Sequence, residues 1–226
     1  AQDATVDGIK YSLSKSLKTA EGKDNISSSH FVQYDVTVTA QEKGAGLLKA
    51  LPPDSLGLVS SLKVTGTING YDIMLIRNKM TVLFLDLTDA DIVANDYEYY
   101  TGCHTEDNVI GDYMFAGLEW LHSVKLPKNA TSIRSYAVYN CVRLKDIVLP
   151  AKLESIGSSA FSQCYQLEHI RLPPMLKSLG DSAFKKCIEL ENIEFPSTLK
   201  SIGSSAFEGC SKLKTISLSE VETIGR

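Results

Sequence analysis

The sequence lacks several features that mark common classes of protein. None of its apolar runs approaches the roughly 18 residues that a membrane-spanning helix needs. It has no run of basic residues, and its net charge of −4 and pI of about 5.6 disfavour binding to a phosphate backbone. We therefore expect no transmembrane segment in this chain and no nucleic acid among its partners.

Motifs for catalysis and cofactor binding are missing as well. The five cysteines form no CxxC pair, which argues against a zinc site. The four histidines are scattered without an HExxH spacing, and there is no GxSxG, Walker or GxGxxG motif. The sequence therefore predicts that the chain is not an enzyme and that it has no catalytic residues, no cofactor and no metal site.

Two weaker metal hypotheses stay open beside this prediction. Asp86, Asp89 and Asp91 lie close together and could offer oxygen ligands to calcium, although aspartate is also a common turn residue. Cys103 and His104 lie next to each other and two residues from Glu106, but the sequence supplies no further ligand that would complete such a site.

A 23-residue repeat dominates the second half of the chain. Units in which an initial Ile or Leu is followed by the pattern G-x-S-A-F-x-x-C begin at residues 156, 179 and 202, and two earlier units begin at residues 110 and 133. A unit of this size cannot bury its apolar face alone, whereas stacked copies bury a continuous core. The repeat therefore predicts a solenoid.

The period continues upstream in a weaker form. Segments that begin at Leu62 and Leu85 are 23 residues apart, but the step from Leu85 to Val124 is 39 residues and exceeds the period by 16. We therefore expect an inserted loop near residues 93–108, between the second and third coils. The solenoid is predicted to span residues 58–226 with about seven coils.

Each unit predicts one short helix and one strand. In the unit from Ile156, four apolar residues have the spacing of one helix face, with Ser158 or Ser159 as the N-cap: Ala160, Phe161, Cys164 and Leu167. Ile170 and Leu172 then alternate with polar residues, as in a strand that ends at Pro173. We expect Gly157 to provide a permissive backbone where the chain turns into the helix.

Four cysteines occupy one position of the repeat, and Leu118 occupies the same position in an earlier unit. A position that accepts leucine is an apolar core position, so these cysteines are predicted to be buried free thiols: Cys141, Cys164, Cys187 and Cys210. Disulfides between neighbouring coils are the alternative, which parallel Cβ directions disfavour. Cys103 lies in the insertion and is expected to be more exposed.

The pattern I-G-x-x-A-F-x-x-C-x-x-L-x-x-I-x-L-P-x-x-L-x-S resembles the BspA-like (Treponema-type) leucine-rich repeat of surface proteins from anaerobic bacteria. The resemblance is strong over residues 110–226, in IGSSAFSQC, SAFKKC, IGSSAFEGC and the prolines that end the strands, and it departs from the pattern at Leu118, Val138 and Ser219. It implies an α/β fold: a right-handed leucine-rich-repeat solenoid with a parallel β-sheet on the concave face and short helices on the convex face. It also implies an extracellular or bacterial cell-surface location and a protein or glycan partner on a host or microbial surface.

Residues 1–57 lie outside the repeat and are predicted to form a small β/α cap. Residues 9–13 and 32–38 alternate between apolar and polar and predict a β-hairpin, and residues 46–51 predict a short helix that ends at Pro52. Solenoids require such a cap, but a separate binding module is the alternative. The start at Ala1 suits either a mature chain without its signal peptide or an arbitrary boundary. The end within a unit leaves open whether the natural chain continues beyond Arg226.

The solvent face of the predicted sheet is the first candidate site, because solenoids commonly bind partners on such a face. Two rows of side chains should point out of it, and their candidate partner-binding residues are Phe84, Lys125, His169, Arg171 and Glu194. The insertion adds Tyr97, Tyr99 and Tyr100, because tyrosine buries a large area at low entropic cost. A solvated face without a partner, and tyrosines packed back on the scaffold, are the alternatives.

The sequence therefore predicts a non-catalytic, secreted or cell-surface binding protein that presents the sheet and the inserted loop to its partner. The alternative is a structural spacer whose coils carry a functional module absent from this chain.

Overall fold

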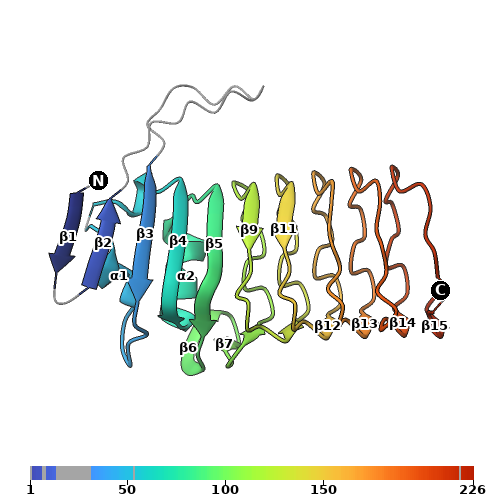
Figure 1. Cartoon of the computed structure of the whole chain (residues 1–226), viewed down its shortest axis with the longest axis horizontal. Helices are drawn as coiled ribbons and strands as arrows, with labels where there is room; N and C mark the ends of the chain where they lie inside the picture. The colour runs from blue at the N-terminus through green and yellow to red at the C-terminus, as the bar shows by residue number, and fades with distance from the viewer. Residues whose placement is uncertain (1, 7–8, 14–31, 53, 219) are drawn as a thin grey trace.

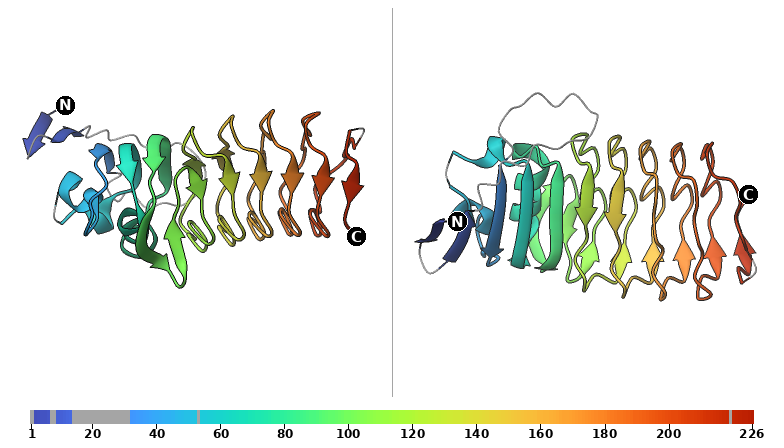
Figure 2. Two further views of the ribbon diagram at one scale, coloured as in Figure 1. Left: turned by 90° about the horizontal axis from the view of Figure 1, so that it is seen from below. Right: turned by 45° about the horizontal axis from the view of Figure 1, so that its top comes forward.

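The computed structural model describes residues 2–6, 9–13, 32–52, 54–218 and 220–226. Its coils are stacked along one axis, so that the two chain termini lie at opposite ends of an elongated molecule (Figure 1). Views from two further directions show the same stacking from the first coils to the last (Figure 2). The predicted solenoid with a parallel sheet is therefore confirmed.

The larger sheet has seven strands in the order β1-β2-β3-β4-β5-β9-β11. β1 pairs with β2, and β2 with β3, in antiparallel fashion, whereas every pair from β3 onwards is parallel. The strands are β1 (Gln2–Val6), β2 (Ile9–Leu13), β3 (Gln33–Val38), β4 (Ser61–Ile68), β5 (Phe84–Ile92), β9 (Ser123–Lys125) and β11 (Asp146–Val148). The strands predicted from alternation near residues 9–13 and 32–38 are thus present.

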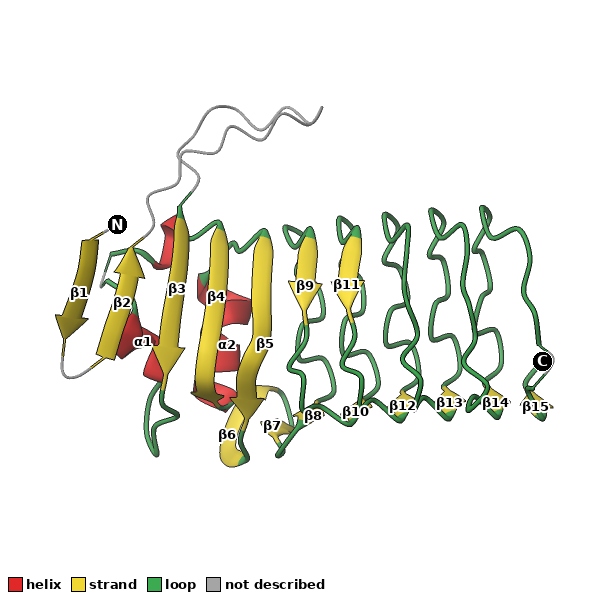
Figure 3. Cartoon of the chain, viewed as in Figure 1, coloured by secondary structure: helices red, strands yellow, loops and turns green. Residues whose placement is uncertain are grey.

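A second parallel sheet runs along one edge of the coils and was not predicted. It has one two-residue strand per coil: β8 (Val109–Ile110), β10 (Ser132–Ile133), β12 (Ser155–Ile156), β13 (Ser178–Leu179), β14 (Ser201–Ile202) and β15 (Thr223–Ile224). Each strand ends at the isoleucine or leucine with which a 23-residue unit begins. This residue is buried in every strand of the row except the last, β15. Figure 3 shows these strands in a row beneath the larger sheet.

Helices occur only beside the first coils of the described chain. α1 (Gly46–Ala50), the 3-10 helix η1 (Leu56–Leu58) and α2 (Gly70–Lys79) are the described helices, and α1 and α2 lie behind β3, β4 and β5 (Figure 3). The buried carboxylate of Asp72 joins α1 to α2, because it accepts hydrogen bonds from the backbone N–H groups of Leu47 at 2.8 Å and Asn69 at 3.1 Å. The short helix expected near residues 46–51 is therefore present, and α2 is the helix expected between the strands of the first two coils.

The predicted helices of the later coils are wrong: these segments form turns in the described chain from residue 110 onwards. Backbone N–H groups alternate between two kinds of acceptor. Ala160 donates to the carbonyl of Gly157 three residues earlier, whereas Phe161 donates to Ala183 in the next coil. An α-helix would direct its N–H groups to carbonyls four residues earlier and would leave none for the neighbouring coil. Ser159, one of the two residues expected as N-cap, has φ of 54° and lies in one of these turns.

The role expected for Gly157 also needs correction. It is not among the residues with positive φ, so a permissive turn does not explain it. A Cβ at this position would lie 2.6 Å from the carbonyl carbon of Arg134 and 2.7 Å from the amide nitrogen of Ser135. Glycine is required here because the backbones of adjacent coils approach closely.

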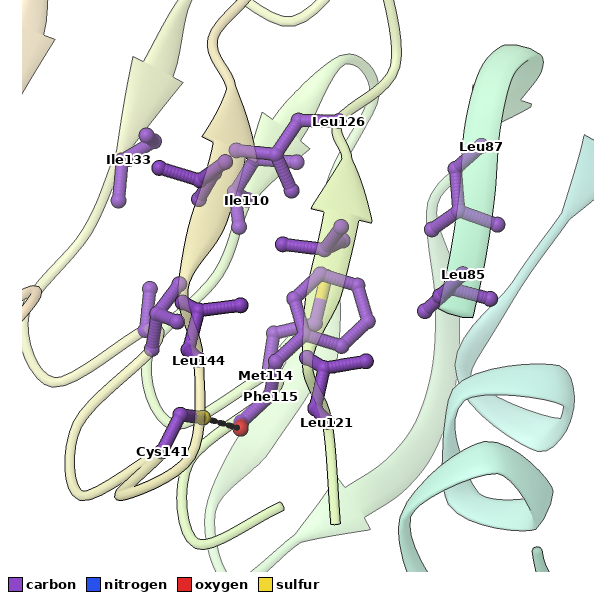
Figure 4. Packing of buried hydrophobic residues seen from close by; sticks show 14 of the residues in the cluster. Leu85, Leu87, Ile110, Met114, Phe115, Leu121, Leu126, Ile133, Cys141 and Leu144 are labelled. Atoms are coloured by element: carbon purple, nitrogen blue, oxygen red, sulfur yellow. Dashed lines mark hydrogen bonds between the residues drawn. The ribbon is translucent and has the colours of Figure 1, made fainter. Parts of the chain in front are cut away.

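The core between the sheets is one continuous cluster from the first coils to the last. Figure 4 shows the part of it around Met114, Phe115 and Cys141. Phe184 is fully buried between Phe161 and Phe207, and the three rings are stacked in parallel. The cysteine prediction is confirmed for Cys141, Cys164 and Cys187, which are buried free thiols, while Cys210 near the end of the stack is partly exposed. Each of the four donates its S–H to a carbonyl of the preceding coil, as Cys141 does to Phe115 at 3.1 Å.

The inserted segment forms a β-hairpin where a loop was expected. β6 (Asn95–Tyr100) pairs in antiparallel fashion with β7 (Cys103–Thr105), with an irregular register between the end pairs. The hairpin packs against α2, as contacts between β6 and the helix show. Its alternating tyrosines explain the difference, because a strand that covers a helix needs an inward apolar face.

Candidate functional site

The two predicted rows of side chains exist on the larger sheet, in the expected register. The first row pairs Ser61, Phe84, Ser123 and Asp146 through ladder contacts, and isolated bridges extend it to His169 and Asn192. The second row pairs Lys63, Asp86, Lys125 and Val148. Among the described residues, no ladder pairing carries the second row on to Arg171 and Glu194, although both are exposed at the following repeat positions.

Both rows begin one strand earlier than predicted. Gln33 pairs with Ser61 and Asp35 pairs with Lys63, so β3 adds one residue to each row. The sequence carried a signal for this extension, since the alternation over residues 32–38 matches that of the later strands. The 23-residue period does not reach β3, however, so repeat matching alone could not place it.

Opposite charges follow one another along the second row and neutralise one another. Lys125 Nζ lies 3.3 Å from Asp86 Oδ2, and Lys128 Nζ lies 2.7 Å from Asp89 Oδ1 nearby. The hydrogen bond from Lys128 and its charge hold the pKa of Asp89 below its ordinary value. Asp91 accepts a hydrogen bond from the Asn129 amide at 2.8 Å. The aspartates of the calcium hypothesis thus have protein partners, and no group of three acidic, histidine or cysteine residues in the described chain is arranged to hold a metal.

Exposed apolar side chains interrupt the polar rows on β5 and β11. The exposed fraction is 40% for Phe84 and 53% for Val148. At the amino-terminal end of β9, Trp120 is 51% exposed, and the Arg143 guanidinium lies 5.1 Å from its ring centroid. The His122 ring lies 6.1 Å from that of Phe84. We call these residues on the sheet and its end the sheet-face patch: Phe84, Trp120, His122, Arg143 and Val148.

The three tyrosines predicted as contact residues in the insertion differ in their exposure to solvent. Tyr99 is buried, and its hydroxyl donates to the carbonyl of Asp112 at 2.7 Å, so its selection as a contact residue is wrong. Tyr97 is half-buried and stacks on Tyr71 of α2 at 3.8 Å. Tyr100 is 44% exposed, and the Arg77 guanidinium lies 4.7 Å from its ring centroid. Only Tyr100 remains well placed to contact a partner.

Tyr100 begins a row of tyrosines that the sequence did not reveal. Its ring stacks on Tyr113 at 5.1 Å, Tyr113 stacks on Tyr136 at 4.9 Å, and Tyr139 meets Tyr136 edge-on at 5.5 Å. Gln163 then links Tyr139 to Tyr165, since its amide donates to the first hydroxyl and accepts from the second. We call these five tyrosines and Gln163 the tyrosine row. The sequence did contain a signal for part of this row: Tyr113 and Tyr136 are 23 residues apart, so they occupy the same repeat position in successive coils.

The tyrosine row and the sheet-face patch are not brought together, contrary to the prediction of one combined site. The row begins on the hairpin and continues on the turns that follow β8 and β10, whereas the patch lies on β5, on β11 and on the segments that precede β9 and β11. In Figure 3 the hairpin lies at the far end of β5 from Phe84, with which that strand begins. The chain therefore carries two separate candidate surfaces.

A small polar pocket of about 110 Å³ lies beside the hairpin, and Cys103, His104, Glu106 and Arg134 are among its lining residues. Arg134 and Glu106 pair across it at 2.6 Å. Cys103 is half-buried rather than exposed, and burial, followed by the charge of Asp112, raises the pKa of its thiol. A raised pKa disfavours the thiolate, so this cysteine is not activated as a nucleophile.

A family model described as BspA type leucine rich repeat region matches residues 106–226 in six copies. A search of curated proteins gives no match. Among solved structures, a leucine-rich repeat protein of T. pallidum aligns with a TM-score of 0.54 and 23% identity, over 85% of this chain and 78% of that one. This likeness shows the fold. No described helix has the length and apolar character that crossing a membrane requires.

Two longer proteins also align. A leucine-rich repeat protein from Bacteroides ovatus is 30% identical with a TM-score of 0.40, over 54% of this chain and 37% of that one. A leucine rich cell surface protein from Faecalibacterium prausnitzii is 20% identical with a TM-score of 0.42, over 100% of this chain and 51% of that one. The present chain thus spans about half or less of the length of these two proteins.

Proposed function

The chain belongs to the BspA-type leucine-rich-repeat family, and on that premise we propose that it is a non-catalytic binding protein whose larger sheet contacts a protein or glycan partner. Repeat proteins of this kind have a binding or a structural role. The resemblance to surface proteins of anaerobic bacteria supports a location at the bacterial cell surface or outside the cell. The natural partner would then be a molecule of a host or microbial surface.

The observation that carries the proposal is the composition of the sheet-face patch. Phe84, Trp120 and Val148 expose apolar surface on a sheet whose other outward residues are polar or charged. Aromatic residues and arginine are the side chains that contribute most to binding energy at protein interfaces, and Arg143 covers the indole of Trp120. Lys125 lies within this patch, and His169, Arg171 and Glu194 follow it on the next coils as exposed polar residues, which resembles the polar rim of an interface.

Arrays of purified host extracellular proteins and of defined glycans test the proposal. We expect the wild-type chain to bind at least one component, and Phe84→Ser and Arg171→Ser to weaken that binding. Lys186→Ser is a matched control, because it removes an exposed cation from a turn segment away from the sheet. Absence of binding by the wild type, or equal effects of Arg171→Ser and Lys186→Ser, would contradict a binding role for the sheet.

A structural spacer is the second candidate, and the paired charges favour it. Lys177 with Glu154 and Lys212 with Glu189 form ion pairs between neighbouring coils, which occupy charges that a partner could use. If the arrays give no binding and the natural gene product joins a further module to the coils, the spacer becomes the better assignment.

We also propose that residues 1–57 cap the solenoid rather than form a separate module. Two features support a cap: β3 continues the sheet in parallel with β4, and Asp72 of α2 binds the backbone of Leu47 in α1. Both contacts would cover the first coil, whose apolar edge a solenoid must shield.

A further inference from the structure

Two members of the tyrosine row are residues that the coil does not need. Tyr113 and Tyr136 have φ of 55° and 57°, in the left-handed region that bulky side chains rarely adopt. Ser159, Ser182 and Ser205 occupy the same position in the next three coils, with φ of 54°, 55° and 53°. Serine thus closes the same turn with the same backbone. A large aromatic residue held in an unfavourable conformation, where a small polar one suffices, points to a role outside the fold.

The row presents hydroxyl groups rather than ring faces. The ring planes of Tyr113 and Tyr136 are parallel, with an interplanar angle of 0°, and their centroids are 4.9 Å apart, so each ring covers a face of the other. Within the described part of the chain, the hydroxyls of Tyr100, Tyr113 and Tyr136 have no hydrogen-bond partner, whereas those of Tyr139 and Tyr165 bond to Gln163. A phenolic hydroxyl can both donate and accept a hydrogen bond. The row therefore offers a line of hydroxyl groups, each of which can donate and accept a hydrogen bond.

The tyrosine row itself contains no charged side chain. Arg77, the cation that contacts the row, turns its guanidinium toward the carbonyls of Tyr113 and Ala116 and over the ring of Tyr100. Desolvation by burial lowers its pKa, as is usual for a cation removed from water. Arg134, on the neighbouring coil, is paired with Glu106. An anionic ligand would find no free cation among these residues, and Asp112, which precedes Tyr113 in the chain, adds a negative charge beside the row.

We propose that the tyrosine row binds a neutral, linear polysaccharide. Sugar hydroxyls also donate and accept, and a linear chain of them matches a line of tyrosine hydroxyls that recurs from coil to coil. The stacked rings hold these hydroxyls in place before binding, which lowers the entropic cost of ordering them. A protein partner would instead be expected to use aromatic faces in a desolvated pocket, and here stacking covers the faces. The site is separate from the sheet-face patch and does not depend on its function.

Affinity electrophoresis and calorimetry of the full chain with soluble polymers test the proposal. The neutral probes are xyloglucan, mixed-linkage β-glucan, galactomannan and amylose, and polygalacturonate is the charged control. We expect the wild type to bind at least one neutral polymer and not polygalacturonate. The double variant Tyr113→Ser/Tyr136→Ser should weaken this binding by roughly tenfold or more, as expected for loss of central contact residues. Because the repeat itself uses serine at this position, the variant is expected to fold.

Two further variants separate the roles of ring, hydroxyl and sheet. Tyr113→Phe/Tyr136→Phe keeps the stack and removes both hydroxyls, and it should also weaken binding. Phe84→Ser alters the sheet-face patch and should bind the polymer as the wild type does. The proposal is overturned if no neutral polymer binds, if either double variant binds like the wild type, or if the double variants lose binding only to a protein, which would make the row a protein interface. Array binding that Phe84→Ser abolishes is a separate result and concerns the sheet.

Discussion

Replacing Phe184 by alanine is expected to destabilise the coils on both sides of it. The ring is fully buried and lies between Phe161 at 5.2 Å and Phe207 at 5.5 Å, with interplanar angles of 9° and 5°. The substitution therefore removes the middle ring of a stack and leaves a cavity that two other rings line. Neighbouring backbones are held by hydrogen bonds between coils, such as that from the Phe184 amide to Ala206, so the cavity cannot easily collapse.

Core Phe→Ala substitutions cost about 3–5 kcal/mol. Stacked aromatic pairs contribute about 0.5–1.5 kcal/mol each beyond their buried area, and two such pairs are lost here. We therefore expect a loss in the upper part of that range, about 4–5 kcal/mol. In a solenoid each coil contacts only its neighbours, so the loss should fall mainly on the coils near residue 184.

Urea denaturation followed with two probes measures this effect. Far-ultraviolet circular dichroism reports on all coils, whereas the fluorescence of the single tryptophan, Trp120, reports on an earlier coil. We expect the dichroism midpoint to fall more than the fluorescence midpoint. Phe207→Ala is the control, because Phe207 is only partly buried and should cost less. An unchanged midpoint for Phe184→Ala, or equal losses for the two variants, would refute the assigned stack.

Three other predictions follow from close contacts and burial. Gly180→Ala should destabilise the chain by at least about 1–3 kcal/mol in thermal unfolding, because a Cβ would lie 2.5 Å from the Gly157 carbonyl carbon. Burial raises the pKa of Cys141 to about 12 and shields its thiol, so mass spectrometry should find it unmodified by iodoacetamide near neutral pH, whereas the partly exposed Cys103 should react slowly. Burial, the largest influence, also raises the pKa of Asp72 above 3.8, so the folded state holds this proton more tightly than the unfolded state. Relative to Asp72→Asn, the wild type should therefore gain stability as the pH falls from about 7 toward 4 in urea titrations.

Each of these predictions has a result that would contradict it. Gly57→Ala is the control for Gly180→Ala, since a Cβ at Gly57 would have no atom within 4 Å. Equal losses of stability in the two variants would contradict the close approach of backbones at Gly180. Equal alkylation rates for Cys141 and Cys103 would show that the Cys141 thiol is not buried. A stability difference between the wild type and Asp72→Asn that stays constant with pH would show that Asp72 does not hold its proton more tightly in the folded state.

The stacking direction and most of the core followed from the sequence because the 23-residue repeat places one residue type at each level. The outward rows from Ser61 to Asn192 have the predicted register for this reason. The turns were predicted as helices because the spacing i, i+1, i+4 and i+7 records only which side chains face inward. It does not record where backbone N–H groups donate, and here the neighbouring coil competes for them.

The candidate site was less predictable because the insertion is not repeated. A period of two along β6 would have placed Tyr97 and Tyr99 on the inner face and Tyr100 on the outer face, once the segment was known to be a strand. Its loop-like composition concealed that pattern. The contacts of Tyr100 with Arg77 and Tyr113 join segments far apart in sequence, and pattern analysis alone does not supply such contacts.

The repeat nevertheless offers a way to find functional residues, because its units serve as controls for one another. Five units share a backbone, so a residue required by that backbone should recur in most of them, as the inward isoleucines and the cysteines do. Tyr113 and Tyr136 recur in only two, and three serines adopt the same φ. The fold therefore cannot be the reason for these tyrosines. If the fold required them, the variant Tyr113→Ser/Tyr136→Ser would lose stability. We expect instead that its unfolding midpoint stays unchanged or rises, because serine replaces a bulky residue in the left-handed region, while its binding to the polymer falls.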